Sequence, residues 1–141
     1  MQKILRIIDA NLNRSQEGLR VCEDIARFAL NDKKMTGSFK KLRHFIGASR
    51  KKIKKEISTL VKARDIKKDI GKKVTKRESE RKNLKTIFIV NMHRVCESLR
   101  VLEEMSKLFD KKLALKFKNA RFKIYGLEKK SYKKMETLLH N

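Results

Sequence analysis

Apolar residues recur at three- and four-residue steps along four long stretches of this 141-residue chain. Such a period is typical of amphipathic α-helices, because residues three and four apart lie on one helix face. The sequence also has no proline and only five glycines, a composition that favours long helices over sheets joined by tight turns. We therefore predict an all-α protein, an antiparallel bundle of four main helices.

The helical pattern sets the expected bounds of these elements. The first helix is expected over about 3–30 and the second over about 38–63, with Ser38 as its N-cap. A charged connector follows at 64–81, and two further helical stretches run from about residue 82 to near the end of the chain. The length suits a single domain over residues 1–141.

An internal repeat divides the chain into two related helical hairpins, over about 3–63 and 82–141. Polar residues of the first hairpin align with residues of the same type in the second. The aligned pairs at an offset of 80 residues are Asn11 and Asn91, Arg14 and Arg94, Glu17 and Glu97, and Arg20 and Arg100; at an offset of 78, Arg43 aligns with Arg121. A duplicated hairpin explains both offsets, and we predict a bundle with two-fold pseudosymmetry.

Two of these pairs lie on or beside the apolar stripes of their helices. On a helical wheel, Asn11 and Asn91 fall among apolar residues, and Arg14 and Arg94 flank the same stripe. One interpretation is that each Asn fixes the helix register and each Arg pairs with a nearby Glu. We favour a ligand site inside the bundle, because inward polar groups cost free energy unless partners are supplied.

The net charge of +23 predicts a positive field that attracts nucleic acid, nucleotides or anionic metabolites. No apolar run approaches the roughly 20 residues that span a bilayer, and the N-terminus has no secretory-signal pattern. We expect a cytoplasmic protein without membrane contact. Cys22 and Cys96 are far apart and form no metal-binding motif, so we expect two reduced thiols and no structural metal.

Four sequence stretches carry a resemblance to a known family. They are NLNRSQEGLRVCEDIARF at 11–28, LRH at 42–44, ARDIKKDIG at 63–71 and NMHRVCESLRVLEE at 91–104. Together they resemble the small hydroxymethylpyrimidine-phosphate kinase family of thiamine biosynthesis, which is often fused to thiamine-phosphate synthase; this chain resembles the stand-alone form. The resemblance implies transfer of the γ-phosphoryl group of ATP to 4-amino-5-hydroxymethyl-2-methylpyrimidine phosphate, giving the diphosphate, with Mg²⁺ as cofactor.

Phosphoryl transfer between two polyanions needs charge neutralisation, and a guanidinium group binds phosphate through two parallel hydrogen bonds. We accordingly assign the inward and repeated polar residues to a site for the nucleotide and the phosphorylated pyrimidine. The predicted catalytic residues are Arg14, Arg94, Glu17 and Glu97, and the predicted substrate- and phosphate-binding residues are Asn11, Asn91, Arg20, Arg100, Arg43, His44, Arg64 and Arg121. Arg43 and Arg121, which are equivalent in the repeat, are expected to face the same cavity.

The connector supplies the predicted metal ligands. Mg²⁺ is usually bound through one or two carboxylates plus substrate phosphates and water, and Asp65 and Asp69 are our candidates. Capping of helix ends is an equal alternative for these two residues. Arg20 and Arg100 point further from the apolar stripe, so ion pairs on a solvated face are an equal alternative for them.

Two other functions stay open on the sequence. The basic runs favour a nucleic-acid-binding helical module, although few aromatic residues are interleaved with them, which weakens this alternative. A helical enzyme acting on a small dicarboxylate without nucleotide would also use inward Arg and Glu residues. The sequence leaves open which hairpin holds ATP and whether the chain forms a homodimer.

Overall fold

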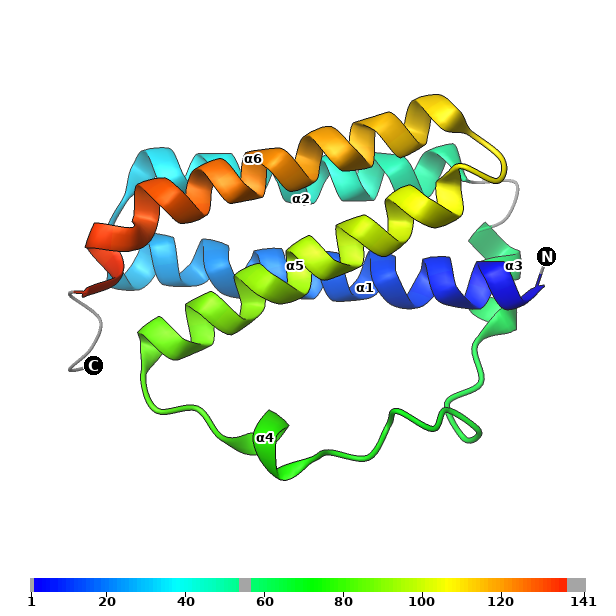
Figure 1. Ribbon diagram of the computed structural model, residues 1–141, viewed down its shortest axis with the longest axis horizontal. Coiled ribbons are helices and arrows are strands. Elements are labelled where there is room, and N and C mark those ends of the chain that lie inside the picture. The colour runs from blue at the N-terminus through cyan, green and yellow to red at the C-terminus, as the bar shows by residue number, and fades with distance from the viewer. Residues whose placement is uncertain (1, 54–56, 137–141) are drawn as a thin grey trace.

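The computed structural model describes residues 2–53 and 57–136, and within these residues it contains helices and no strand (Figure 1). The prediction of an all-α bundle is confirmed. Its four long helices are α1 (Gln2–Asp24), α2 (Lys33–Lys52), α5 (Leu84–Ser106) and α6 (Lys111–Met135). Among the described helices, none combines the length and the apolar character that crossing a membrane would require.

The long helices form two antiparallel hairpins, α1 with α2 and α5 with α6 (Figure 1). The helices α1 and α5 cross and pack against each other, and α2 and α6 lie together on the other side of the bundle. A long connection that includes the short helices α3 (Ile57–Ala63) and α4 (Lys76–Ser79) returns along the bundle to the start of α5. Of these, α3 packs against α1.

Aromatic and aliphatic side chains from both hairpins fill the core. Phe39 of the first hairpin and Phe88 of the second meet edge to face, with ring centroids 5.8 Å apart. Phe45 and Phe117 make an equivalent contact at 5.6 Å between α2 and α6. The predicted stripes supply these residues, so each helix buries its apolar face in one core shared by the two hairpins.

A small residue allows α1 and α5 to cross closely. A Cβ atom added at Gly18 would lie 2.7 Å from Cγ2 of Val95 and 3.1 Å from the backbone oxygen of Asn91. Both distances are too short for an ordinary contact, so any larger residue here would push the two helices apart. The crossing at Gly18 therefore sets how the two repeated helices face each other.

The second helix begins at Lys33, earlier than the predicted start at Ser38. Its N-cap is Asp32, whose Oδ1 accepts a hydrogen bond from the backbone N–H of Met35 at 2.9 Å. Ser38 lies within the helix, and its hydroxyl donates to the carbonyl oxygen of Lys34. Asp110 caps α6 in the same way, which adds a capping Asp pair to the internal repeat.

A π-helical segment, η1 (Ile25–Ala29), follows α1 and explains the change of repeat offset. The segment from Asp24 to Asp32 is two residues longer than its counterpart from Glu104 to Asp110. The wider π-turn takes up extra residues without ending the helix. Asn31 then has a positive φ of 51°, a conformation that Asn tolerates better than most residues, and the chain turns into α2.

The predicted second helix does not correspond to one element. The helix α2 ends at Lys52 and α3 begins at Ile57; residues 54–56, which the prediction included, lie outside the described residues. The predicted connector at 64–81 contains the short helix α4. Residues 137–141 of the predicted second repeat also lie outside the described part of the chain.

Candidate functional site

An open cleft of about 800 Å³ runs along one side of α1. Its walls come from α1, from the segment that follows α3, and from Val101 of α5. Five predicted site residues line it: Asn11, Arg14, Arg64, Asp65 and Asp69. The fold thus brings together two groups of residues that are about fifty positions apart in the sequence.

The cleft is lined by charges of both signs. Lys3 and Arg6 of α1 add to the two predicted arginines, so four cationic side chains face three carboxylates, those of Asp9, Asp65 and Asp69. A lining of this kind offers donors to phosphate groups and oxygen ligands to a hard cation. This cleft is therefore the candidate site.

Asp9 holds the segment after α3 against α1. Its carboxylate is buried and accepts two hydrogen bonds from Arg64, at 2.5 Å from Nε and 2.9 Å from Nη2. The bond to Asp9 raises the pKa of the Arg64 guanidinium above its ordinary value. Arg50 of α2 lies 3.5 Å from the same carboxylate. Asp9 was not among the predicted site residues, although it lies one helical turn from the buried Leu5 and Leu12.

The two asparagines adopt the same conformation in the two hairpins. The Nδ2 of Asn11 donates to the carbonyl oxygen of Ile7, and the Nδ2 of Asn91 donates to that of Ile87, both at 2.8 Å. Asn11 is buried, as predicted, whereas Asn91 is half-buried. These bonds satisfy one donor of each amide within its own helix and leave the side-chain oxygen without a hydrogen-bond partner in the described part of the protein.

The prediction of a ligand site inside the bundle is wrong for the guanidinium groups of Arg14 and Arg94. Arg14 and Arg94 are both exposed, and so are Glu17 and Glu97. The wheel placed these residues at the edge of the apolar stripe, where long charged side chains extend into water. Arg14 nevertheless lines the open cleft, whereas the lining of the cleft does not include Arg94.

Arg43 is engaged in an ion pair in the first hairpin. Its Nε donates to Oε1 of Glu23 at 3.0 Å, and Arg20 donates to the other carboxylate oxygen at 3.0 Å. Burial alone would raise the pKa of Glu23, but the bonds and charges of Arg43 and Arg20 outweigh it and lower that pKa. The alternative of ion pairing, which the sequence left open for Arg20, therefore describes Arg20 well, and Arg43 shares the same carboxylate.

The second hairpin repeats this ion pair. Nη2 of Arg121 donates to Glu103 at 3.0 Å, and Arg100 lies 4.0 Å from the same carboxylate. The hydrogen bonds from Arg121 to Tyr125 and to Glu103 raise the pKa of Arg121. Arg121, Arg100 and the predicted residue Glu97 line a separate hollow of about 380 Å³. Of five pockets in the described residues, Arg121 lines one and Arg43 lines none, so the predicted shared cavity is not among these five.

His44 is exposed on α2, and it lines none of the same five pockets of the described residues. The two candidate metal ligands each use one oxygen in a local turn. Oδ1 of Asp65 accepts from the backbone of Lys68 at 2.9 Å, and Oδ1 of Asp69 accepts from that of Gly71 at 2.8 Å. No group of three or more His, Cys, Asp or Glu in the described sequence could hold a metal ion. Two carboxylates in one cleft fit Mg²⁺ that arrives on nucleotide phosphates rather than in an all-protein cage.

Comparison with known proteins assigns the family. The sequence model of the ThiD2 family matches residues 6–130. The chain belongs to the ThiD2 family. This ThiD2 protein is also 40% identical over 128 residues to a protein named thiamine-phosphate synthase from Nostoc punctiforme, a match that covers 90% of this chain and 35% of the relative. No solved structure matches this protein.

Two further relatives carry the same name. The proteins from Synechocystis and Rhodopirellula baltica are 38% and 36% identical to this ThiD2 protein, over 89% and 87% of its length. These matches cover 35% and 32% of the relatives, so the chain spans about a third of the length of the curated relatives it matches. Their names connect the family to thiamine biosynthesis, which confirms that part of the resemblance. The kinase activity stays a prediction.

Proposed function

We propose that this ThiD2 protein is a phosphotransferase. It transfers the γ-phosphoryl group of ATP to 4-amino-5-hydroxymethyl-2-methylpyrimidine phosphate and releases the diphosphate. The observation that carries the proposal is the cleft in which Asn11, Arg14, Arg64, Asp65 and Asp69 meet. The relatives support it indirectly. The match covers about a third of each relative, so the remaining two thirds of its chain are available for the thiamine-phosphate synthase activity that its name gives.

The chemistry of the acceptor suits a site without a strong general base. A phosphate monoester has its second pKa near about 6, so its attacking oxygen is largely deprotonated at neutral pH. Asp9, the buried carboxylate of the cleft, is already bonded to Arg64 and is not needed as a base. The attacking phosphate oxygen forms a bond to the γ-phosphorus of ATP, and the bond to the β–γ bridging oxygen breaks, which leaves ADP.

The cationic side chains of the cleft would neutralise and orient the two polyanions. Arg14 is suited to bind phosphate oxygens in pairs, and Arg64 keeps its Nη1 for a phosphate because its Nε and Nη2 are bonded to Asp9. Lys3 and Arg6 add positive charge at the same wall. Asp65 and Asp69 would hold Mg²⁺, which supplies further neutralisation of the nucleotide phosphates when bound. ATP would be held by side chains and helix ends, since the sequence has no glycine-rich phosphate loop.

The site would select the phosphorylated acceptor because the free alcohol cannot form ion pairs with the arginines of the cleft. Because Arg14 is exposed, water hydrates its guanidinium when no phosphate is bound, so rejecting the free alcohol does not depend on a buried unpaired charge. Each charge-assisted hydrogen bond that the alcohol cannot make costs about 1.5 to 3 kcal/mol, or roughly ten- to hundredfold in specificity, and the alcohol also lacks the ionised oxygen that attacks in a site without a strong base.

A transfer assay tests the proposal. Purified protein is incubated with ATP, Mg²⁺ and the pyrimidine phosphate, and the products are followed by ³¹P NMR, which separates monoester from diphosphate. We expect ADP and the pyrimidine diphosphate in equal amounts, none with the free alcohol, and none after chelation of Mg²⁺. Folded protein that forms no diphosphate would refute the kinase function. Turnover of a small dicarboxylate without nucleotide would then favour the alternative helical enzyme, and salt-sensitive binding of nucleic acid alone would favour the nucleic-acid-binding module.

A further inference from the structure

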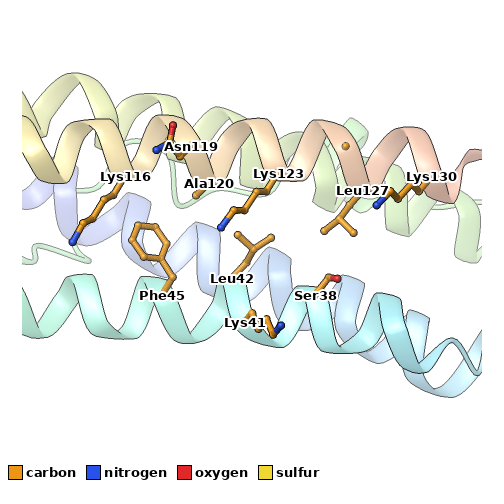
Figure 2. A pocket seen from close by; sticks show the side chains of 11 residues that line it. Ser38, Lys41, Leu42, Phe45, Lys116, Asn119, Ala120, Lys123, Leu127 and Lys130 are labelled. Atoms are coloured by element: carbon orange, nitrogen blue, oxygen red, sulfur yellow. The ribbon is translucent and has the colours of Figure 1, made fainter.

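A second groove lies on the other side of the bundle, between α2 and α6, with a volume of about 680 Å³ (Figure 2). The two helices pack mainly against α1 and α5 and touch each other only sparsely. Leu42 and Phe45 of α2 and Leu127 of α6 form an apolar floor. The proposed reaction uses none of these residues, because the candidate cleft lies along α1.

The rim of the groove carries only positive charge. Four lysines line the groove, and its lining includes no acidic residue. Figure 2 shows Lys116, Lys123 and Lys130 on α6, and Lys41 on the facing helix. None of the four pairs with a carboxylate in the part of the chain that the structure describes. The nearby ammonium group of Lys52 lowers the pKa of Lys116, so this rim carries unneutralised like charges.

The three lysines of α6 are spaced by seven residues. Seven residues are about two helical turns, so these lysines form a row with roughly 10 Å between neighbours. A helix laid along the groove with acidic residues at the same seven-residue spacing would bring one carboxylate to each lysine. Its apolar residues, three and four positions apart, would then contact the floor.

We propose that the groove between α2 and α6 docks an acidic amphipathic helix of a partner protein. A second copy of this chain fits poorly, because each copy has 39 basic side chains against 16 acidic ones and would bring lysine to lysine. A single-stranded nucleic acid also fits less well, because Phe45 is the one aromatic residue among those lining the groove, and such sites stack successive bases on several aromatics.

A peptide-binding measurement tests this proposal without depending on the kinase activity. The probe is a fluorescent amphipathic peptide of about 18 residues with Glu at every seventh position and Leu on one face, long enough to reach from Lys116 to Lys130. Its control has the same composition in scrambled order. We expect the designed peptide to bind at least about tenfold more tightly than the scrambled one in fluorescence anisotropy.

Charge reversal in the groove then locates the binding. The double variant Lys116→Glu/Lys123→Glu should bind the peptide about tenfold more weakly, whereas Lys118→Glu, an exposed lysine of α6 that does not line the groove, should change it little. Far-UV circular dichroism confirms that each variant folds. Equal binding of both peptides, equal effects of the two kinds of variant, or tighter binding of a single-stranded oligonucleotide to the same lysines would overturn the proposal.

Discussion

The close crossing of α1 and α5 predicts an unusual response to the substitution Gly18→Ala. Alanine normally stabilises a helix relative to glycine, by about 1 kcal/mol. At Gly18, however, the new methyl group would lie 2.7 Å from the Val95 side chain and 3.1 Å from the Asn91 backbone oxygen. Neither atom moves easily, because valine is stiff at χ1 and a backbone oxygen moves only with its helix.

The magnitude follows from these two opposing contributions. Forcing an extra methyl group into a packed interface costs about 1 to 3 kcal/mol, so the net effect of Gly18→Ala ranges from near zero to about 2 kcal/mol of destabilisation. Gly37 provides a matched control, since it lies in α2 and an added Cβ would meet no atom within 4 Å. The helix-propensity gain is common to both variants, so Gly18→Ala should be about 1 to 3 kcal/mol less stable than Gly37→Ala.

Urea unfolding followed by circular dichroism at the helical band measures this difference. Both variants should keep the wild-type dependence of free energy on urea, with only the midpoint shifted. If Gly18→Ala were as stable as Gly37→Ala, then α1 and α5 would not cross at Gly18 as described, and the reasoning about this close crossing would be refuted.

Three further predictions concern titratable and charged side chains. Asp9→Asn should lower the free energy of unfolding by about 1 to 2 kcal/mol in a urea titration, less than for a fully buried pair because the Arg64 side chain is 41% exposed and can be hydrated; an unchanged midpoint would argue against this ion pair. Arg43 helps to hold the pKa of Glu23 below its unfolded value. The ion pair of Glu23 therefore stabilises the folded protein above about pH 4.5, and this stabilisation is lost as pH falls through the folded pKa. Glu23→Gln should therefore be less stable than wild type at pH 7 but lose less stability between pH 5 and 3, measured as unfolding midpoints at each pH. Burial, with the Glu128 charge, raises the pKa of Cys96 to about 11, so alkylation of this thiol at about pH 8 should be slow until urea unfolds the protein.

The sequence predicted the helices well because each buries one apolar face, and that periodicity is visible in the residues themselves. It predicted their ends less well. Ser38 and Asp32 are both good capping residues, and the choice of Asp32 depends on where the chain leaves the π-helical turn at Ile25–Ala29. Local pattern carries no information on that turn, which takes up the extra length of the first repeat.

The sequence predicted several residues of the candidate site, but not how deeply each side chain is buried. A helical wheel gives the direction of Arg14 and Asn11 around α1, yet it cannot say how far each lies from solvent, and only Asn11 is buried. Asp9 was missed because its partner, Arg64, lies 55 residues away, beyond the reach of any helical period. The ion pair of Arg20 with Glu23 matches the alternative that the sequence allowed for Arg20, whereas the pairing of the same carboxylate with Arg43 on another helix was not predicted.

The most direct test of the central claim is phosphoryl transfer by Arg14→Gln compared with Arg27→Gln. Each variant removes one positive charge from an exposed arginine, but Arg14 lines the cleft and Arg27 does not. With the pyrimidine phosphate as acceptor, we predict that kcat/KM falls roughly ten- to hundredfold for Arg14→Gln, as expected for a lost charge-assisted hydrogen bond, and stays near wild type for Arg27→Gln. Equal activity of the two variants would contradict a phosphate-binding role for this cleft.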